Sequence, residues 1–219
     1  NCNNTSKDKE EIQPSKDSQT SLGDPSGNAD AGYWDKWFET VSKGTRFEWY
    51  VSTFEIAGIL ETFAVSGKGG YFKNLEVLHG GSGNSEMIFD FVGKPYNIKK
   101  QTALDISGVA INEMNSKLEK LQLSSDTAVE FLLQDVLLPL PFEDESYDAW
   151  IDKGLIDAMF DSFSDSNQAN IGKLFNHANR ILRNDSPYIC ITLAEEHILK
   201  LFLHTLSESA EWSTLNIIA

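Results

Sequence analysis

The sequence has few cysteines and no long apolar run, and each shortage excludes a class of protein. None of its apolar segments approaches the roughly 20 residues that a membrane-spanning helix needs, which argues against a membrane protein. The two cysteines are Cys2, in a polar stretch, and Cys190, in an apolar one. This usage is typical of a reducing compartment and not of a disulfide framework, so we expect a cytoplasmic protein.

Positive charge is also scarce. Lysine and arginine number 18 against 33 acidic residues, which gives a net charge of −15. Because a nucleic-acid groove needs clustered lysine and arginine, nucleic acid is not an expected partner. The excess of acid favours a basic partner, or it only keeps the protein soluble.

Apolar side chains are nearly missing from residues 1–30, which we expect to form a disordered tail. The remainder, residues 31–219, is long enough for one domain with a substantial core. Aromatic residues gather at its start, between Tyr33 and Tyr50, and a helical spacing of apolar residues follows over 54–63. We expect Phe47 and Phe54 to pack in the core.

Beyond this segment, strand-like apolar runs alternate with helical patterns. The predicted strands are 75–79, 102–107, 128–136, 147–152, 188–193 and 212–218. The predicted helices are 107–121, 154–163, 167–182 and 195–206. Such alternation predicts an α/β fold with a doubly wound, mostly parallel sheet.

The carboxyl ends of the predicted strands carry glycine and acid, at the edge where parallel sheets bind ligands. The first strand runs into Gly80, Gly81 and Gly83, a bare turn that suits either close approach of a ligand or a tight turn alone. An acid closes each of the next three strands: Asp105, Asp135 and Asp152. Any one of these acids, taken alone, is best explained as a helix cap. Three of them at successive strand ends indicate instead one bound ligand with hydroxyl and amino donors.

The spacing between the glycine turn and Asp105, and the residues of the turn itself, limit which class of ligand fits. Asp105 stands 24 positions after Gly81, near the ~20 residues at which an acid reaches the ribose of a bound nucleoside. Glu86 occupies the place of the third glycine that a pyrophosphate turn needs, so a dinucleotide is a poor fit. S-adenosylmethionine has no phosphate and carries a cationic sulfonium, which an acidic and aromatic pocket suits.

Six segments in a fixed order carry a family resemblance: YWDKWF, FEWY, VLHGGSGNSE, LDIS, PFEDESYDAWIDKGLIDA and YICITLAEEHILK. With them, the chain from about Tyr33 onward resembles class I S-adenosylmethionine-dependent methyltransferases. More narrowly, it resembles the amino-terminal domain of the elongation factor 1-alpha lysine methyltransferases related to methyltransferase-like protein 13. The resemblance implies a Rossmann-like sheet with an added N-terminal helix over the cofactor. We expect the last strand of that sheet to lie outside this chain or to be lost.

The resemblance also implies roles for individual residues and a protein substrate, a lysine of elongation factor 1-alpha. The cofactor residues implied are Trp34, Phe38 and Trp49 as a lid, Gly81, Ser82 and Gly83 at the methionine, Asp105 and Ile106 at the ribose, Asp135 and Val136 at the adenine, and Lys153 at the mouth. The candidates for the substrate channel are Asp152, Lys153 and Asp157. No metal is expected.

Two alternatives stay open. The family usually has cysteine or alanine at Ser82, threonine at Leu155 and a glycine pair near Asn184, so a methyltransferase-fold scaffold with little turnover is one alternative. The other is a hydrolase with Ser82 as the nucleophile, although Asn84 replaces the second glycine of that elbow. The histidines available to such a serine, His177, His197 and His204, fall in predicted helices.

Overall fold

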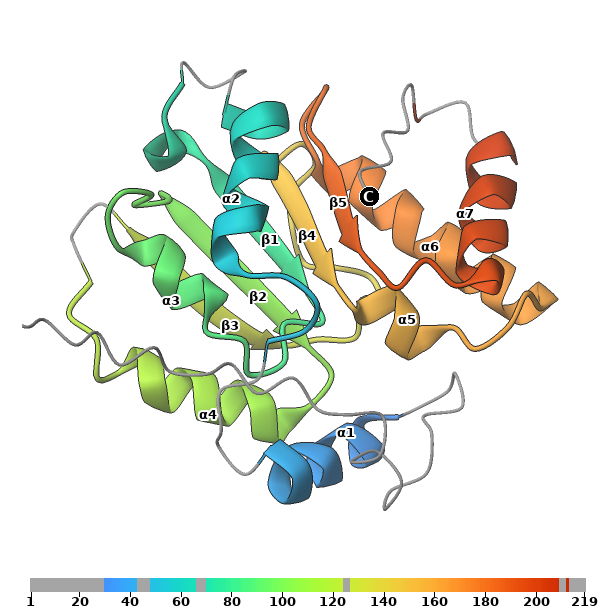
Figure 1. Ribbon diagram of the computed structural model, residues 1–219, viewed down its shortest axis with the longest axis horizontal. Coiled ribbons are helices and arrows are strands. Elements are labelled where there is room, and N and C mark those ends of the chain that lie inside the picture. The colour runs from blue at the N-terminus through green and yellow to red at the C-terminus, as the bar shows by residue number, and fades with distance from the viewer. Residues whose placement is uncertain (1–29, 43–47, 66–69, 124–126, 209–211, 213–219) are drawn as a thin grey trace, which may run out of the picture.

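The computed structural model describes residues 30–42, 48–65, 70–123, 127–208 and 212. Its sheet has five parallel strands in the order β3-β2-β1-β4-β5 (Figure 1). The strands are β1 Glu76–Gly80, β2 Lys100–Asp105, β3 Ala128–Leu133, β4 Ala149–Lys153 and β5 Tyr188–Ile191. The chain winds outward from β1 in one direction and then from β4 in the other. Ligands of such sheets bind where the winding reverses, at the carboxyl ends of β1 and β4.

Helices cover both faces of the sheet, as the alternation predicts (Figure 1). Their bounds are α1 Ala31–Trp37, α2 Thr53–Leu60, α3 Met87–Val92, α4 Gly108–Leu118, α5 Leu155–Met159, α6 Asp165–Ile181 and α7 Glu196–Glu208. π-helical turns extend α1 over Phe38–Ser42 and α2 over Glu61–Val65, and a 3-10 turn spans Phe72–Asn74. Successive residues of β1 face opposite layers: Val77 packs in the core under α2 and α3, and Leu78 packs in the core under α6.

Local signals in the sequence set the helix starts. Ser107 caps α4 by accepting from Ala110 N–H, and Ser164 caps α6 in the same way from Asn167 N–H. The face of α6 that touches the sheet carries Ile171, Leu174 and Ala178, all fully buried. The predicted helices and the first five predicted strands are therefore confirmed in type and order.

An ionic cluster closes the amino-terminal edge of the sheet. Arg183 donates to Asp148 Oδ1 at 2.7 Å and to Glu76 Oε2 at 3.0 Å. The other oxygen of Asp148 accepts from Glu76 N–H at 2.8 Å, so the start of β1 is tied to the residue before β4. Asp148 is 2% exposed. We call Arg183, Asp148 and Glu76 the basal cluster.

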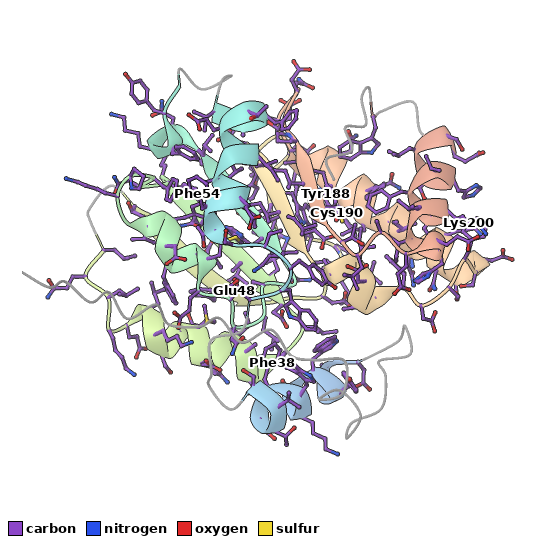
Figure 2. The ribbon with its side chains drawn as sticks, viewed as in Figure 1. Phe38, Glu48, Phe54, Tyr188, Cys190 and Lys200 are labelled. Atoms are coloured by element: carbon purple, nitrogen blue, oxygen red, sulfur yellow. The ribbon has the colours of Figure 1, made fainter. Side chains whose placement is uncertain are left out.

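Two sequence predictions were wrong in detail. The third strand ends at Leu133 and not at 136, so Asp135 lies two residues beyond it. Phe54 is 78% exposed, because α2 turns Ile56, Ala57 and Leu60 toward the sheet and Phe54 away from it (Figure 2). The six-residue helix α3 was not predicted. Phe47, the predicted tail except Asp30, and the predicted strand 212–218 except Trp212 lie outside the described residues.

Candidate functional site

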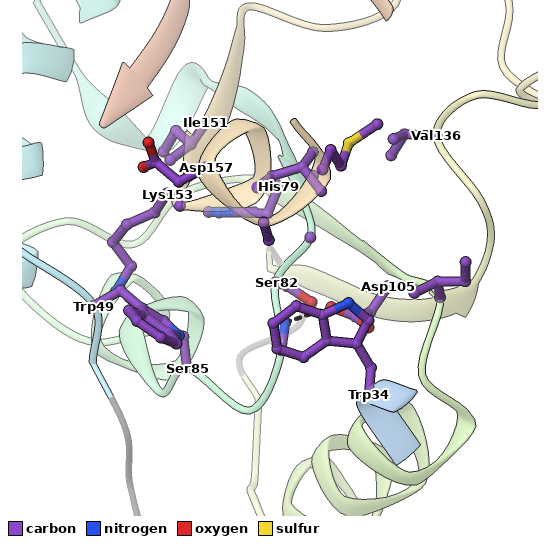
Figure 3. Close-up of a pocket in the computed structure, with 18 of the residues that line it drawn as sticks. Trp34, Trp49, His79, Ser82, Ser85, Asp105, Val136, Ile151, Lys153 and Asp157 are labelled. Atoms are coloured by element: carbon purple, nitrogen blue, oxygen red, sulfur yellow. Dashed lines mark hydrogen bonds between the residues drawn. The ribbon is translucent and has the colours of Figure 1, made fainter. Parts of the chain in front are cut away.

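The carboxyl ends of β1, β2 and β4 open into a cavity of about 1090 Å³ (Figure 3). All eleven residues assigned to a cofactor from the sequence line it: Trp34, Phe38, Trp49, Gly81, Ser82, Gly83, Asp105, Ile106, Asp135, Val136 and Lys153. Of the channel candidates, Asp157 and Lys153 line it and Asp152 does not. Figure 3 shows two ends, with Trp34 and Asp105 at one and Trp49, Lys153 and Asp157 at the other.

The glycine turn is bare because neighbouring side chains fill the space beside it. Gly81 and Gly83 have φ of 59° and 52°, a region that residues with a Cβ rarely adopt. A Cβ at Gly81 would lie 2.7 Å from Leu155 Cδ1, and one at Gly83 would lie 3.1 Å from Phe38 Cζ. The turn therefore forms part of the cavity floor with its backbone, while α1 and α5 pack closely on it.

Backbone amides hold the Asp105 carboxylate at the end of β2. Gly83 N–H donates to Oδ2 at 2.7 Å and Ser107 N–H donates to Oδ1 at 2.8 Å. The residue is 7% exposed, and burial raises the pKa of its carboxyl although the amide bonds act against that rise. The carboxylate keeps free lone pairs toward the cavity, where it can accept from hydroxyl groups of a ligand.

Aromatic residues of α1 and the segment after it form the wall beside Asp105. Trp37 and Phe38 pack on Ala110 of α4, with Trp34 and Trp49 against them. Asp35 fixes α1 in place, because its Oδ1 accepts from Ser107 Oγ at 2.6 Å and from Val109 N–H at 3.1 Å. These bonds, the Ser107 hydroxyl first, lower the pKa of Asp35.

Asp135 reaches the cavity from the loop after β3. Its Oδ1 accepts from Leu137 N–H at 2.8 Å, which sets the direction in which Val136 faces the cavity. The loop itself is tied to β2, since Gln134 N–H donates to the Asp105 carbonyl at 2.9 Å. Asp105 and Asp135 therefore lie on adjoining segments of the same wall, as the strand-end pattern predicts.

A buried ion pair that no spacing in the sequence indicates stands at the other end. Lys153 pairs with Glu48, and the two side chains are 6% and 8% exposed. Glu48 also accepts from Ser85 Oγ at 2.7 Å and from Glu86 N–H at 2.8 Å. We call Glu48, Lys153 and Ser85 the clamp. It joins three segments that are distant in sequence, and its one sequence signal is an acid enclosed by aromatic residues in FEWY.

Asp157 and Asp152 differ in position although both stand near the carboxyl end of β4. Asp157 lines the cavity and accepts from Thr192 Oγ1 at 2.6 Å and from Leu193 N–H at 3.2 Å. Asp152 is fully buried beneath the floor, where it accepts from Leu155 N–H at 2.9 Å and from the Tyr188 hydroxyl at 2.8 Å. Burial raises the pKa of Asp152 to about 7. Of the two roles considered for Asp152, its contact with the first amide of α5 matches the helix cap and not the substrate channel.

The electrostatics of the cavity suit a cationic ligand with hydroxyl groups. Its described lining holds a single lysine against seven acids: Asp30, Glu48, Asp105, Asp135, Asp157, Asp161 and Glu195. Burial, and then the charge of Lys153, lower the pKa of His79 to about 3, so its imidazole is neutral. Among the described residues, the buried Ser82 Oγ has no hydrogen-bond partner, which leaves it for a ligand.

The same observation bears on the hydrolase alternative. A nucleophilic serine needs a base within hydrogen-bonding reach, and Ser82 Oγ makes no such bond in the described part of the chain. His177 lies on α6, and His197 and His204 lie on α7, as expected. We found no group of acids, histidines or cysteines that could hold a metal ion among the described residues. No helix in this part of the chain is long and apolar enough to span a membrane.

Comparison with known proteins gives a consistent result. A family profile described as "Methyltransferase domain" matches residues 72–215. The proteins named "eEF1A lysine and N-terminal methyltransferase" from Bos taurus and Mus musculus are 30% and 31% identical over 169 and 175 residues. These matches cover 77% and 80% of this chain but 22% of each relative, so the chain spans about a fifth of their length.

Among solved structures, the cyclase SpnF shares the fold. It is 14% identical, with a TM-score of 0.50, and the match covers 82% of this chain and 74% of that one. At this identity the likeness shows the fold alone. The parallel five-stranded sheet with helices on both faces is the Rossmann-like fold of class I methyltransferases.

Proposed function

This chain belongs to the methyltransferase-domain family, and on that premise we propose that it is a protein methyltransferase acting on a lysine of translation elongation factor 1-alpha. The cofactor of class I methyltransferases is S-adenosylmethionine. The substrate part of the proposal draws on the names of the relatives that are about 30% identical. A cytoplasmic location belongs to the same proposal.

One observation carries the proposal: a buried carboxylate, held by two backbone amides, stands beside a glycine turn in an acidic cavity. We assign Asp105 and Ile106 to the ribose, the turn Gly81–Gly83 to the methionine part, and Asp135 and Val136 to the adenine. Trp34 and Phe38 would cover the bound cofactor. The unpartnered Ser82 hydroxyl and the acidic lining fit these groups, so the residues present match the ligand.

Methyl transfer requires little of the protein beyond holding the two reactants in line. When bound, S-adenosylmethionine supplies a methyl carbon that the neighbouring sulfonium has already activated. The chain must therefore hold an acceptor amine in line with that carbon and keep other nucleophiles out. The acidic lining attracts a lysine ammonium, and the aromatic wall limits the entry of water.

Two measurements test the proposal in sequence. Calorimetry with S-adenosylhomocysteine is expected to show binding, because the product keeps the ribose, adenine and amino-acid groups. Incubation of purified elongation factor 1-alpha with the protein and cofactor is expected to add mass in steps of one methyl group, read by intact-protein mass spectrometry. Binding without any modified protein would favour the scaffold alternative, and no binding would overturn the proposed function.

A further inference from the structure

Tyr50 occupies a strained turn at the clamp end of the cavity. Its φ is 64°, a region that a bulky side chain rarely adopts, and Val51 N–H donates to the Trp49 carbonyl across it at 2.8 Å. This conformation costs about 1–2 kcal/mol relative to an ordinary backbone. Such strain persists where the surrounding structure fixes the chain on both sides, and it gathers at functional sites.

The chain is fixed on both sides of Tyr50. Two residues before it, Glu48 is held in the clamp by Lys153 and Ser85 and by the amide of Glu86. Two residues after it, Ser52 begins α2 with a capping box, in which Ser52 N–H donates to Glu55 Oε2 at 2.8 Å. The capping box fixes where α2 begins. The clamp fixes the position of the Tyr50 turn relative to the glycine turn that forms the cavity floor.

The ring of Tyr50 lies against a glycine that leaves room for it. Gly154 has φ of 81°, and a Cβ there would lie 3.3 Å from Tyr50 Cε2. Tyr50 and Asp157 both line the cavity, and burial, followed by the charge of Asp157, raises the pKa of the Tyr50 hydroxyl. Asp157 is itself held by Thr192 and Leu193 from the end of β5.

We infer that the Tyr50 hydroxyl and Asp157 bind the acceptor amine, and that Glu48 is the positioning residue that holds Tyr50 against Gly154 for this task. The inference rests on the proposed function and adds the amine-binding point to it. It explains together a buried ion pair, a strained tyrosine and a glycine in the left-handed region, all on the cavity wall.

The chemistry of these two groups suits the step. The phenol oxygen of Tyr50 can accept one N–H of the neutral amine, and the Asp157 carboxylate can accept the other. The nitrogen lone pair is then left for the methyl carbon, since both N–H bonds are taken up. The arriving ammonium would first release one proton to water. The N–C bond would then form as the S–C bond breaks, with its electrons going to sulfur, and the methylated product would leave as an ammonium. Asp157 attracts the ammonium that arrives and stabilises the one that forms.

The direct test uses n-butylamine as an analogue of the lysine side chain. Saturation-transfer NMR on the S-adenosylhomocysteine complex is expected to detect the bound amine in the wild-type protein. Tyr50→Phe and Asp157→Asn should each weaken the signal about tenfold, as expected for hydrogen bonds to a charged or polarised group. Their affinities for S-adenosylhomocysteine should stay within about twofold of wild type, because neither residue lies at the Asp105 end.

The positioning role is tested by a double variant and a matched control. Glu48→Gln should lower kcat/KM for elongation factor 1-alpha about tenfold or more, and Tyr50→Phe should add little further loss once Glu48 is changed, because Glu48 acts through Tyr50. Glu55→Gln is the matched control: it makes the same change on the other side of the turn, and glutamine keeps a capping box. This control should equal wild type in amine binding and in kinetics.

The outcomes separate the two claims. A wild-type complex that shows no amine signal, or a Tyr50→Phe variant with undiminished signal, overturns the inference and leaves the proposed function standing. Fully additive losses for Glu48→Gln and Tyr50→Phe overturn the positioning role. A wild-type protein that does not bind S-adenosylhomocysteine overturns the proposed function, and the inference falls with it.

Discussion

At one end of the cavity the Asp105 carboxylate is held by backbone amides, whereas at the other end the Lys153 ammonium is held by a side chain from a distant segment. The amide donors of Asp105 come from Gly83 and Ser107, 22 and 2 positions away. Glu48 is 105 positions from Lys153. Backbone donors survive most substitutions, while a side-chain pair fails when either member changes. The Asp105 end is therefore the more robust, and the clamp end is the more sensitive.

The largest expected effect tests the sensitivity of the clamp. Lys153→Met leaves the Glu48 carboxylate buried without its counter-charge and should lower the free energy of unfolding by about 3–5 kcal/mol. Adding Glu48→Gln to this variant removes the second charge and should restore most of the loss. Urea unfolding measures all three proteins. Lys200→Met is the control, since its exposed pair with Glu196 is worth at most about 1 kcal/mol. Equal losses in the single and double variants would show that the two charges are not coupled.

The next effect concerns the Asp105 end. Asp105→Asn removes the charge and keeps an acceptor oxygen for only one of the two amides, because Gly83 and Ser107 donate to different oxygens of Asp105. We expect the affinity for S-adenosylhomocysteine to fall by about 1.5–3 kcal/mol, roughly 10- to 100-fold, with the fold kept. Calorimetry gives the affinity. Asp185→Asn is the control because Asp185 is exposed and asparagine also tolerates its φ of 62°. An unchanged affinity in a folded Asp105→Asn variant would remove the ribose assignment.

A smaller expected effect is a dependence of the free energy of unfolding on pH. Burial raises the pKa of Asp152 to about 7, above the ~3.9 of an unfolded chain. The folded state therefore binds the proton more tightly, and this contribution to stability is full below pH ~4 and is lost as the pH rises through about 7. Between pH 6 and 8 the stability of wild type should fall relative to Asp152→Asn by on the order of 1 kcal/mol. Urea unfolding at four pH values measures this difference, and parallel curves for the two proteins would contradict it.

The smallest effect should come from Phe54→Ala, outside both ends of the cavity. Because Phe54 is 78% exposed, we expect a change in the free energy of unfolding within about 0.5 kcal/mol. The matched buried change, Phe91→Ala in α3, should cost about 3–5 kcal/mol, since Phe91 is fully buried. A large loss from Phe54→Ala would show that its ring is covered in solution.

The sequence predicts the Asp105 end and the sheet because their signals are local. Short apolar runs mark each strand, and the glycine turn and Asp105 stand at a spacing that the strand–helix–strand unit fixes. Asp152 lies beneath the cavity and not on its wall, which its position in the chain does not indicate unless the alternation of side chains along a strand is considered. In β4 the neighbours Ile151 and Lys153 line the cavity, so Asp152 between them must face the other way.

The clamp could not be predicted for a different reason. No periodicity connects Glu48 to Lys153, and which distant side chains meet is decided only when the layers pack. Phe54 illustrates the same limit on a smaller scale. Its spacing correctly indicates a helix, but an apolar residue at a helix start does not show which face will meet the sheet.

The basal cluster has a consequence for how this protein can change over evolutionary time. Arg183, Asp148 and Glu76 secure the sheet at the starts of β1 and β4, and the cavity opens at their ends. Substitutions at such separated places combine nearly independently. A gain in stability at the base can therefore compensate for a destabilising change at the rim. The protein can accept new residues around Tyr50 and Asp157, and with them new acceptors, without losing the sheet that carries them.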